Sequence, residues 1–213
     1  MINYSLSAFQ EPRGVMRILQ FIFAIVAFST TANFSVDVKF ECASYPNSTR
    51  TVSYPFRFSE SVCKNKENSN VVMAGDLSSD AQFYVATGVL SLLYCIFIIA
   101  VYAFIDEVYK SKSEIPLADF MLTTVLAIFW LSGSAAWANG TNALKTATDS
   151  RYLANTCHLC TVLTSSFSRL NISLIIGFLN FFLWASDLWF LYKETIWFQG
   201  KQANVGNSGT PTV

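Results

Sequence analysis

A long apolar run near the end of the chain, residues 170–195, constrains the fold more than any other stretch. It is long enough to cross a bilayer as one helix, which takes about 20 residues. At about 100° per residue, one arc of this helix carries small or polar side chains, namely Ser173, Gly177, Asn180, Trp184 and Asp187. The opposite arc carries bulky apolar ones, namely Ile172, Ile175, Leu179, Phe182 and Phe190. An amide or a carboxylate facing lipid would go unsatisfied, so the polar arc must pack against other spans in a bundle.

The composition agrees with an integral membrane protein. Of the 213 residues, 53% are hydrophobic and only 13% are charged, and the charges gather between apolar runs. These runs predict spans at 15–35, 81–105, 117–138 and 171–192, which is an all-α fold, a four-transmembrane-helix bundle. Residues 1–14 form an N-terminal segment, 15–197 the four-span domain and 198–213 a polar tail predicted to be disordered. A formal net charge of zero without a basic block argues against nucleic acid as a partner.

The first span has a second polar and small face. One arc of 15–35 carries Arg17, Gln20, Ala24, Ala27 and Thr31. A cleaved signal peptide is the alternative for this stretch, since it has a basic start, an apolar middle and small residues near its end. The apolar run is longer than the usual core of a signal peptide, about 7–15 residues, which favours a span.

The third span is expected to pack through small residues. Thr124, Ile128, Ser132, Ala135 and Asn139 share one arc of its helix. Small side chains let two helix backbones approach closely in lipid, where no hydrophobic force drives helices together. This arc is therefore predicted to face a neighbouring helix.

The longest polar segment, 37–80, contains Cys42, Cys63 and the glycosylation sequon that begins at Asn47. Cysteines and a sequon together indicate an oxidising lumen or the cell exterior. A Cys42–Cys63 bridge would close a loop of about 20 residues and stabilise the fold by roughly 3 kcal/mol, and two unrelated thiols are the alternative.

The second polar segment, 139–169, carries Cys157-His158-Leu159-Cys160. Four spans place both termini on one side of the membrane and both cysteine-containing segments on the other. The basic residues on the two sides do not decide the orientation by number, but the cysteines and Asn47 place the termini in the cytosol and the two segments in the lumen.

Short motifs in a fixed order resemble one family. They are Glu11-Pro12, ECA at 41–43, YPFR at 54–57, GDLSSDAQF at 75–83, Asp119-Phe120, SAAWANG at 134–140, and LNISLIIGFLNFFLW with LWFLYKETIW through the last span. In this order and spacing the chain, over about 11–197, resembles the synaptophysins, four-span vesicle proteins of the MARVEL type. The resemblance implies a vesicle membrane protein without catalysis that associates with itself and with the vesicle SNARE synaptobrevin. It also implies a role in vesicle trafficking, sorting and exocytosis.

The chain departs from that family in three places. Its tail lacks the Tyr/Gly/Pro/Gln repeats of neuronal synaptophysin, so it is more similar to the short-tailed, pantophysin-like members or to an invertebrate relative. The cysteines of the second segment are closer together than in the family, and four cysteines allow three connectivities. Asp187 stands where the family usually has a neutral Asn.

The motif Cys157-His158-Leu159-Cys160 also suggests a redox pair, with His158 favouring the thiolate. A membrane thiol oxidoreductase is therefore the enzyme alternative. The motif lies about 10 residues before the last span in a polar segment, which favours a structural bridge instead.

Asp187 is the second residue with two interpretations. As a carboxylate within a span it costs about 2.5–3.5 kcal/mol at mid-membrane, less near the end. One interpretation is an ion pathway lined by Asn180 and Asp187, which would make the protein a channel or pore-forming subunit. The other is a buried ion pair, for which Arg17, at similar depth on the first span, is the hypothesised partner.

The sequence therefore predicts a non-enzymatic, self-associating organiser of transport or synaptic vesicles, glycosylated at Asn47. A claudin- or tetraspanin-type adhesion protein fits less well, because the expected cysteine patterns of those families are absent. No cofactor is expected, although bound cholesterol, common to the resembled family, has a loose pattern at Arg17, Phe21 and Val26.

Overall fold

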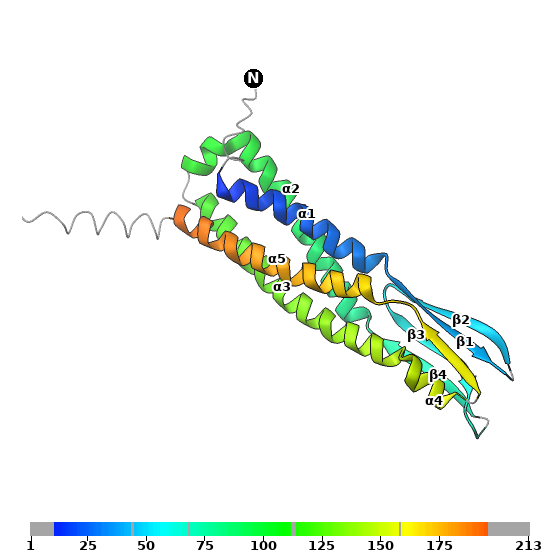
Figure 1. Cartoon of the computed structure of the whole chain (residues 1–213). Helices are drawn as coiled ribbons and strands as arrows, with labels where there is room; N and C mark the ends of the chain where they lie inside the picture. Colours follow the sequence, from blue (N-terminus) through cyan, green and yellow to red (C-terminus); the bar gives the residue numbers. More distant parts are fainter. Residues whose placement is uncertain (1–10, 44, 68, 112–113, 158, 196–213) are drawn as a thin grey trace, which may run out of the picture. The chain divides into compact units, whose positions relative to one another are not determined.

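The computed structural model describes residues 11–43, 45–67, 69–111, 114–157 and 159–195 (Figure 1). Among these residues, four helices are long and apolar enough to cross a membrane: α1 (Pro12–Ala32), α2 (Ser78–Ser111), α3 (Glu114–Ala147) and α5 (Ser168–Glu194). This confirms the predicted four-span fold. Each helix begins about three residues before its predicted span, and α3 continues nine residues past the predicted end at 138. The predicted tail, 198–213, lies outside the described residues.

The helices bury the small and polar arcs of α1 and α5. Arg17, Gln20, Ala24, Ala27 and Thr31 on α1 all have zero exposed surface. On α5, the arc from Ser173 to Asp187 is buried, while Ile175 and Phe182 are 68% and 62% exposed. A bilayer would surround these outward apolar side chains, so the inward position of the polar ones follows from the cost of placing them in lipid.

The prediction for the packing face of α3 is wrong. Ile128 is 56% exposed, and Ser132, Ala135 and Asn139 also face outward. Two tryptophans, Trp130 and Trp137, are fully buried instead. Their indole N–H groups donate to Ser91 Oγ at 2.9 Å and Ser173 Oγ at 3.1 Å. Burying the large indole ring is more favourable than burying small side chains, and the indole N–H finds an acceptor inside the protein. The tryptophan face of α3 therefore packs inward in place of the small-residue face.

The two polar segments are not plain loops, as the predicted all-α fold implied, because their described residues form five strands. These are β1 (Ser35–Cys42), β2 (Tyr45–Ser53), β3 (Arg57–Lys64), β4 (Asn70–Asp76) and β5 (Cys160–Thr164), with a short helix α4 (Ser150–Thr156) before β5. The sequence carries the strand signal in β1, where Val36, Val38 and Phe40 are buried and Lys39 and Glu41 are exposed. Alternation with a period of two is the pattern of a half-buried strand.

Strand pairing joins the two polar segments to each other. One antiparallel sheet has the order β2-β1-β5, and β3 and β4 form a separate hairpin. In the first sheet Lys39 lies opposite Leu163 and Cys42 opposite Cys160. Since β1 follows α1 and β5 precedes α5, the segments after the first span and before the last one meet in a single sheet.

The chain divides into two compact units, which are described separately. One consists of Met1–Ile25, Thr87–Leu131 and Phe178–Val213, and the other of Val26–Ala86 and Ser132–Gly177. In the second unit the first three residues of the motif YPFR connect β2 to β3, with Phe56 fully buried, and Arg57 begins β3. The Phe56 ring lies 5.3 Å from the Trp137 ring and 6.3 Å from the Phe34 ring, measured between centroids. This aromatic cluster forms the core between the strands and the helices of that unit.

Local polar contacts mark the start of α2. The Asp76 carboxylate accepts hydrogen bonds from the Ser78 hydroxyl at 2.6 Å and the Ser78 N–H at 3.2 Å. These two bonds stabilise the ionised form and lower the pKa of Asp76 below its usual value. The first amides of a helix have no acceptor within the helix, and the Asp76 carboxylate supplies one for the Ser78 N–H.

Candidate functional site

Arg17 of α1 lies at the centre of a buried polar cluster in the first unit. Its Nη2 atom is 2.5 Å from Asp119 Oδ1 and 2.7 Å from Thr123 Oγ1, both on α3. Its Nη1 atom is 2.9 Å from Gln20 Oε1 and 3.1 Å from Asp187 Oδ2 on α5. One guanidinium therefore connects three spans, which its planar fork of donors makes possible.

Both carboxylate oxygens of Asp119 accept hydrogen bonds, and the donors are side chains of several residues. Its Oδ1 atom accepts from Arg17 and from the Tyr94 hydroxyl at 2.5 Å, and also from Thr123 at 3.3 Å. Its Oδ2 atom accepts from the hydroxyls of Tyr102 at 2.6 Å and Tyr109 at 2.9 Å. All three tyrosines belong to α2, so the carboxylate brings the second span into the same cluster. Hydrogen bonds to an ionised acceptor are about twice as strong as neutral ones.

A break in α2 explains how two of these tyrosines reach one oxygen. Tyr102 and Tyr109 are seven residues apart, which in a straight helix is about 10.5 Å along the axis. The backbone at Ile105 is not helical, with φ −136° and ψ 32°. Beyond this residue the end of α2 changes direction (Figure 1), and the two rings meet edge to face at 5.0 Å between centroids. The kink therefore places Tyr109 beside Asp119.

Gln20 connects the other carboxylate to Arg17. Its Oε1 atom accepts from Arg17, and its Nε2 atom donates to Asp187 Oδ2 at 3.0 Å. Asp187 Oδ1 is buried and has no hydrogen-bond partner among the described residues. Asp187 is therefore held through one of its oxygens only, whereas both oxygens of Asp119 are satisfied.

Aromatic rings complete the surroundings of the cations. The Arg17 guanidinium lies 5.3 Å from the Tyr94 ring centre and 5.4 Å from the Trp184 ring centre. Arg13, one turn earlier on α1, lies 4.8 Å from the Tyr109 ring centre, and its Nη2 atom is 2.7 Å from Glu11 Oε2. A cation over an aromatic face gains up to about 2 kcal/mol when desolvated. The rings thus offset part of the cost of burying two arginines.

The charges of the cluster are paired with one another. A buried charge must be paired to be tolerated, and here a guanidinium lies between two carboxylates. A metal cation approaching either carboxylate would meet the positive charge of Arg17. Among the described residues, no group of three or more His, Cys, Asp or Glu side chains could hold a metal ion.

The structure brings together three of the four residues predicted to pack within the membrane: Arg17, Gln20 and Asp187. The fourth, Asn180, is buried two turns earlier on α5, and its Nδ2 atom donates to the backbone oxygen of Phe23 at 3.2 Å. This bond joins α5 to α1.

Sequence reasoning missed the α2 and α3 members of the cluster: Tyr94, Tyr102, Tyr109, Asp119 and Thr123. Asp119 fell near the edge of the predicted third span, where a carboxylate needs no partner. One signal was present, because Asp119 and Thr123 are four residues apart and share a helix face. The sequence did not indicate that the tyrosines belong to the cluster, because aromatic residues are common along a membrane span.

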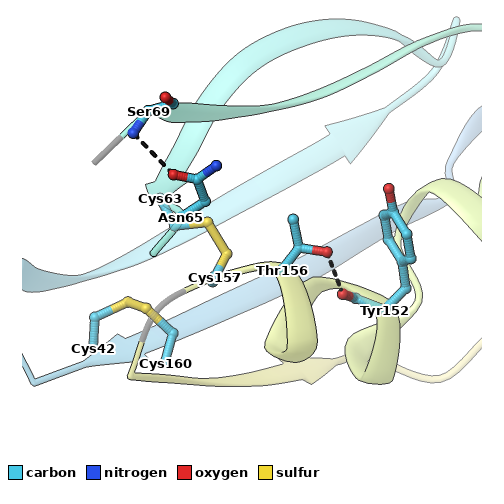
Figure 2. The surroundings of a disulfide bond; sticks show 8 residues. All are labelled: Cys42, Cys63, Asn65, Ser69, Tyr152, Thr156, Cys157 and Cys160. Carbon is cyan, nitrogen blue, oxygen red and sulfur yellow. Dashed lines mark hydrogen bonds between the residues drawn. A yellow bond between two sulfur atoms is a disulfide. The ribbon is translucent and has the colours of Figure 1, made fainter. Parts of the chain in front are cut away.

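The four cysteines of the polar segments form two disulfides, Cys42–Cys160 and Cys63–Cys157 (Figure 2). The Cys42–Cys63 bridge considered from the sequence is therefore wrong. The register of β1 and β5 places Cys42 opposite Cys160, and each bond crosses between the two polar segments. Cys157 and Cys160 are not bonded to each other, as a redox pair would be, and His158 lies outside the described residues. Figure 2 shows the two bridges leaving the Cys157–Cys160 segment toward different strands.

Asn47 lies on β2 with an exposed side chain, as does Thr49 of the same sequon. Exposed residues of β1 and β5 share this outward sheet face: Lys39 and Glu41 on β1, and Thr161 and Leu163 on β5. The position is sterically open to an added glycan.

A comparison with protein families adds one finding. The family model for MARVEL, described as a membrane-associating domain, matches residues 8–190. The match covers the first three spans, both polar segments and all but the last four residues of α5.

Proposed function

The chain belongs to the MARVEL family of membrane-associating domains, and we propose that it is a non-enzymatic organiser of transport or synaptic vesicles. In this proposal it sorts vesicle partners, in particular the vesicle SNARE synaptobrevin, and takes part in vesicle trafficking and regulated exocytosis. In the same proposal it associates with further copies of itself and binds membrane cholesterol, but it binds no nucleic acid and needs no cofactor.

The polar cluster around Arg17 is the observation that supports this proposal most directly. It pairs the charged side chains of three spans, Arg17, Asp119 and Asp187, with one another, and α2 joins them through tyrosine hydroxyls. Such mutual pairing supports a rigid membrane body rather than a reaction centre. Residues of the motifs that resemble the synaptophysins make buried contacts that hold this body together. Asp119 belongs to the cluster, and Phe56 and Trp137 belong to the aromatic core of the second unit.

The proposed orientation places both termini in the cytosol and the disulfide-linked segments in the lumen. Two disulfides and the exposed sequon at Asn47 support an oxidising compartment for those segments. We expect glycosidase treatment to increase the gel mobility of the wild-type protein and to leave Asn47→Gln unchanged. Thr49→Ala should behave like Asn47→Gln, while Thr51→Ala, also exposed on β2, should keep the glycan.

The vesicle role is tested by capture of intact organelles. A tag placed after Val213 should be digested by protease in unbroken vesicles, and vesicles isolated through that tag should contain synaptobrevin. The matched control is another four-span protein of the same cells carrying the same tag. Protection of the tag would refute the orientation, and absence of synaptobrevin from the isolated vesicles would refute the sorting role.

A channel is the second candidate function, and Asp187 favours it through one buried oxygen that has no hydrogen-bond partner in the described part of the chain. Against it, the positive charge of Arg17 lies 3.1 Å from the other oxygen and opposes cation passage. Ion flux through reconstituted vesicles that disappears in Asp187→Asn would favour the channel. The thiol oxidoreductase alternative has less support, because Cys157 and Cys160 belong to different disulfides.

A further inference from the structure

An apolar groove of about 410 Å³ runs between α2 and α3 in the first unit. Its apolar lining comes from both helices: Phe97, Ile98, Val101 and Ile105 on α2, and Ile115 and Leu122 on α3. The volume falls within the usual range of ligand sites, about 300–1,000 Å³. Phe97 is 61% exposed and Leu122 is 49% exposed, so the groove opens outward from both helices.

The polar groups at the inner side of the groove are hydrogen-bonded to each other. Tyr94 and Asp119 are the polar residues there, and the Tyr94 hydroxyl donates to Asp119. Both Asp119 oxygens already accept from Arg17 and the tyrosines. Because the hydrogen bonds of Asp119 are charge-assisted and the rest of the lining apart from Glu114 is apolar, the groove suits an apolar chain.

The ends of the groove differ in character. Ala118 and Leu122 line it toward the middle of the span, and Glu114, the first residue of α3, lines it where the helix begins. From Glu114 to Leu122 the helix rises about 12 Å. Glu114 is exposed, so a carboxylate lies at the mouth of an apolar channel that enters the membrane-spanning part of the chain. The kink at Ile105 lies on the opposite wall of this groove.

We propose that this groove binds one acyl chain of a phospholipid whose headgroup carries an ammonium, held at the rim by Glu114. The bilayer is the medium around these spans, so acyl chains are present at high concentration beside the groove. The ammonium of an ethanolamine or choline headgroup pairs with the Glu114 carboxylate, and an anionic glycerol headgroup is repelled by it. The inference depends on the chain spanning a membrane and is independent of the vesicle role.

The test is native mass spectrometry of the protein in mild detergent with added phosphatidylethanolamine or phosphatidylglycerol. We expect the ethanolamine lipid to bind the wild-type protein about 5-fold more tightly. Glu114→Gln should remove that preference while retaining the bound chain. Ala118→Phe fills the groove and should abolish lipid retention, while Ala135→Phe, at another exposed alanine of α3, should retain it.

A second measurement uses the wild-type protein, so it does not require a substituted variant to fold. Wild-type protein is reconstituted with phosphatidylethanolamine carrying a photoreactive diazirine in its acyl chain, and cross-linked residues are mapped. Cross-links concentrated at Phe97 and Leu122 support the proposal. Cross-links spread equally over Ile175 and Phe182, which are exposed on α5, would overturn it. Displacement of the phospholipid by a sterol, or a change of oligomeric size in Ala118→Phe with lipid retained, would also overturn it.

Discussion

The two buried carboxylates around Arg17 should differ sharply in their contribution to stability. Asp119 accepts hydrogen bonds at both oxygens, from one cation, one threonine and three tyrosines. Asp187 has contacts at one oxygen only, to Arg17 and Gln20. We therefore predict that Asp119→Asn destabilises the protein far more than Asp187→Asn, although both changes remove one buried negative charge.

The expected magnitudes follow from the geometry. The NH₂ group of an asparagine at 119 must point either toward Arg17 or toward the hydroxyls of Tyr102 and Tyr109. Both sides present donors to the native carboxylate, so the NH₂ group meets donors in either orientation. At least two charge-assisted bonds are then lost, at about 1.5–3 kcal/mol each, and breaking a buried ion pair by removing one partner costs about 3–5 kcal/mol. An asparagine at 187 keeps an oxygen for Arg17 and Gln20 and turns its NH₂ toward the side where Oδ1 has no partner. It also leaves Arg17 paired with Asp119, so the loss should be about 1 kcal/mol or less.

The assay is unfolding in mild detergent by titration with a denaturing detergent, followed by tryptophan fluorescence. Glu41→Gln, which removes an exposed carboxylate on β1, is the control for a change of net charge and should have no effect. The double variant Asp119→Asn with Asp187→Asn should show non-additive losses, because both carboxylates contact the same guanidinium. Equal losses in the two single variants, or a larger loss in Asp187→Asn, would refute the assignment of Asp119 as the principal partner of Arg17.

Three further predictions concern the kink, a close helix contact and the disulfides. Tyr109→Phe removes one donor to Asp119 Oδ2 and should lower the unfolding free energy by about 1.5–3 kcal/mol in the same titration. The control Tyr152→Phe, at a residue 64% exposed, should leave the unfolding free energy unchanged. Gly177→Ala places a Cβ 2.6 Å from Ser134 Oγ and 2.7 Å from the Tyr84 hydroxyl and should cost about 1–3 kcal/mol by thermal unfolding; no loss would mean that the helices there are further apart. Peptide mapping without reductant should recover Cys42 linked to Cys160 and Cys63 linked to Cys157, and a peptide linking Cys42 to Cys63 would contradict the strand register.

The resemblance to the synaptophysins and the family match agree on the same membrane fold. The motif residues give this agreement a physical basis, because several of them are buried contacts rather than surface features. Asp119 accepts from side chains of α1 and α2, and Phe56 packs on Trp137. The vesicle role remains a proposal that the organelle experiments decide.

The sequence by itself determined the spans and the inward faces of α1 and α5. Both follow from local regularities: a span is a continuous apolar run, and the helical period alone decides that Arg17 and Gln20 share a face. The period-two alternation of Val36, Val38 and Phe40 was equally local, so β1 could have been predicted from the sequence. The packing face of α3 was ambiguous because two arcs of the same helix offered plausible contacts, one of small residues and one of tryptophans.

Only the tertiary structure decided which side chains meet across elements. Asp119 is the principal partner of Arg17 because α1 and α3 lie in contact at that depth, and no local pattern encodes the relative depth of two helices. Tyr109 reaches the same carboxylate only because α2 is broken at Ile105, where the sequence has neither Gly nor Pro to mark a kink. Cys42 pairs with Cys160 because β1 and β5 align in that register, although 118 residues separate them. Periodicity fixes the direction of a side chain, but its partner depends on contacts between segments distant in the chain.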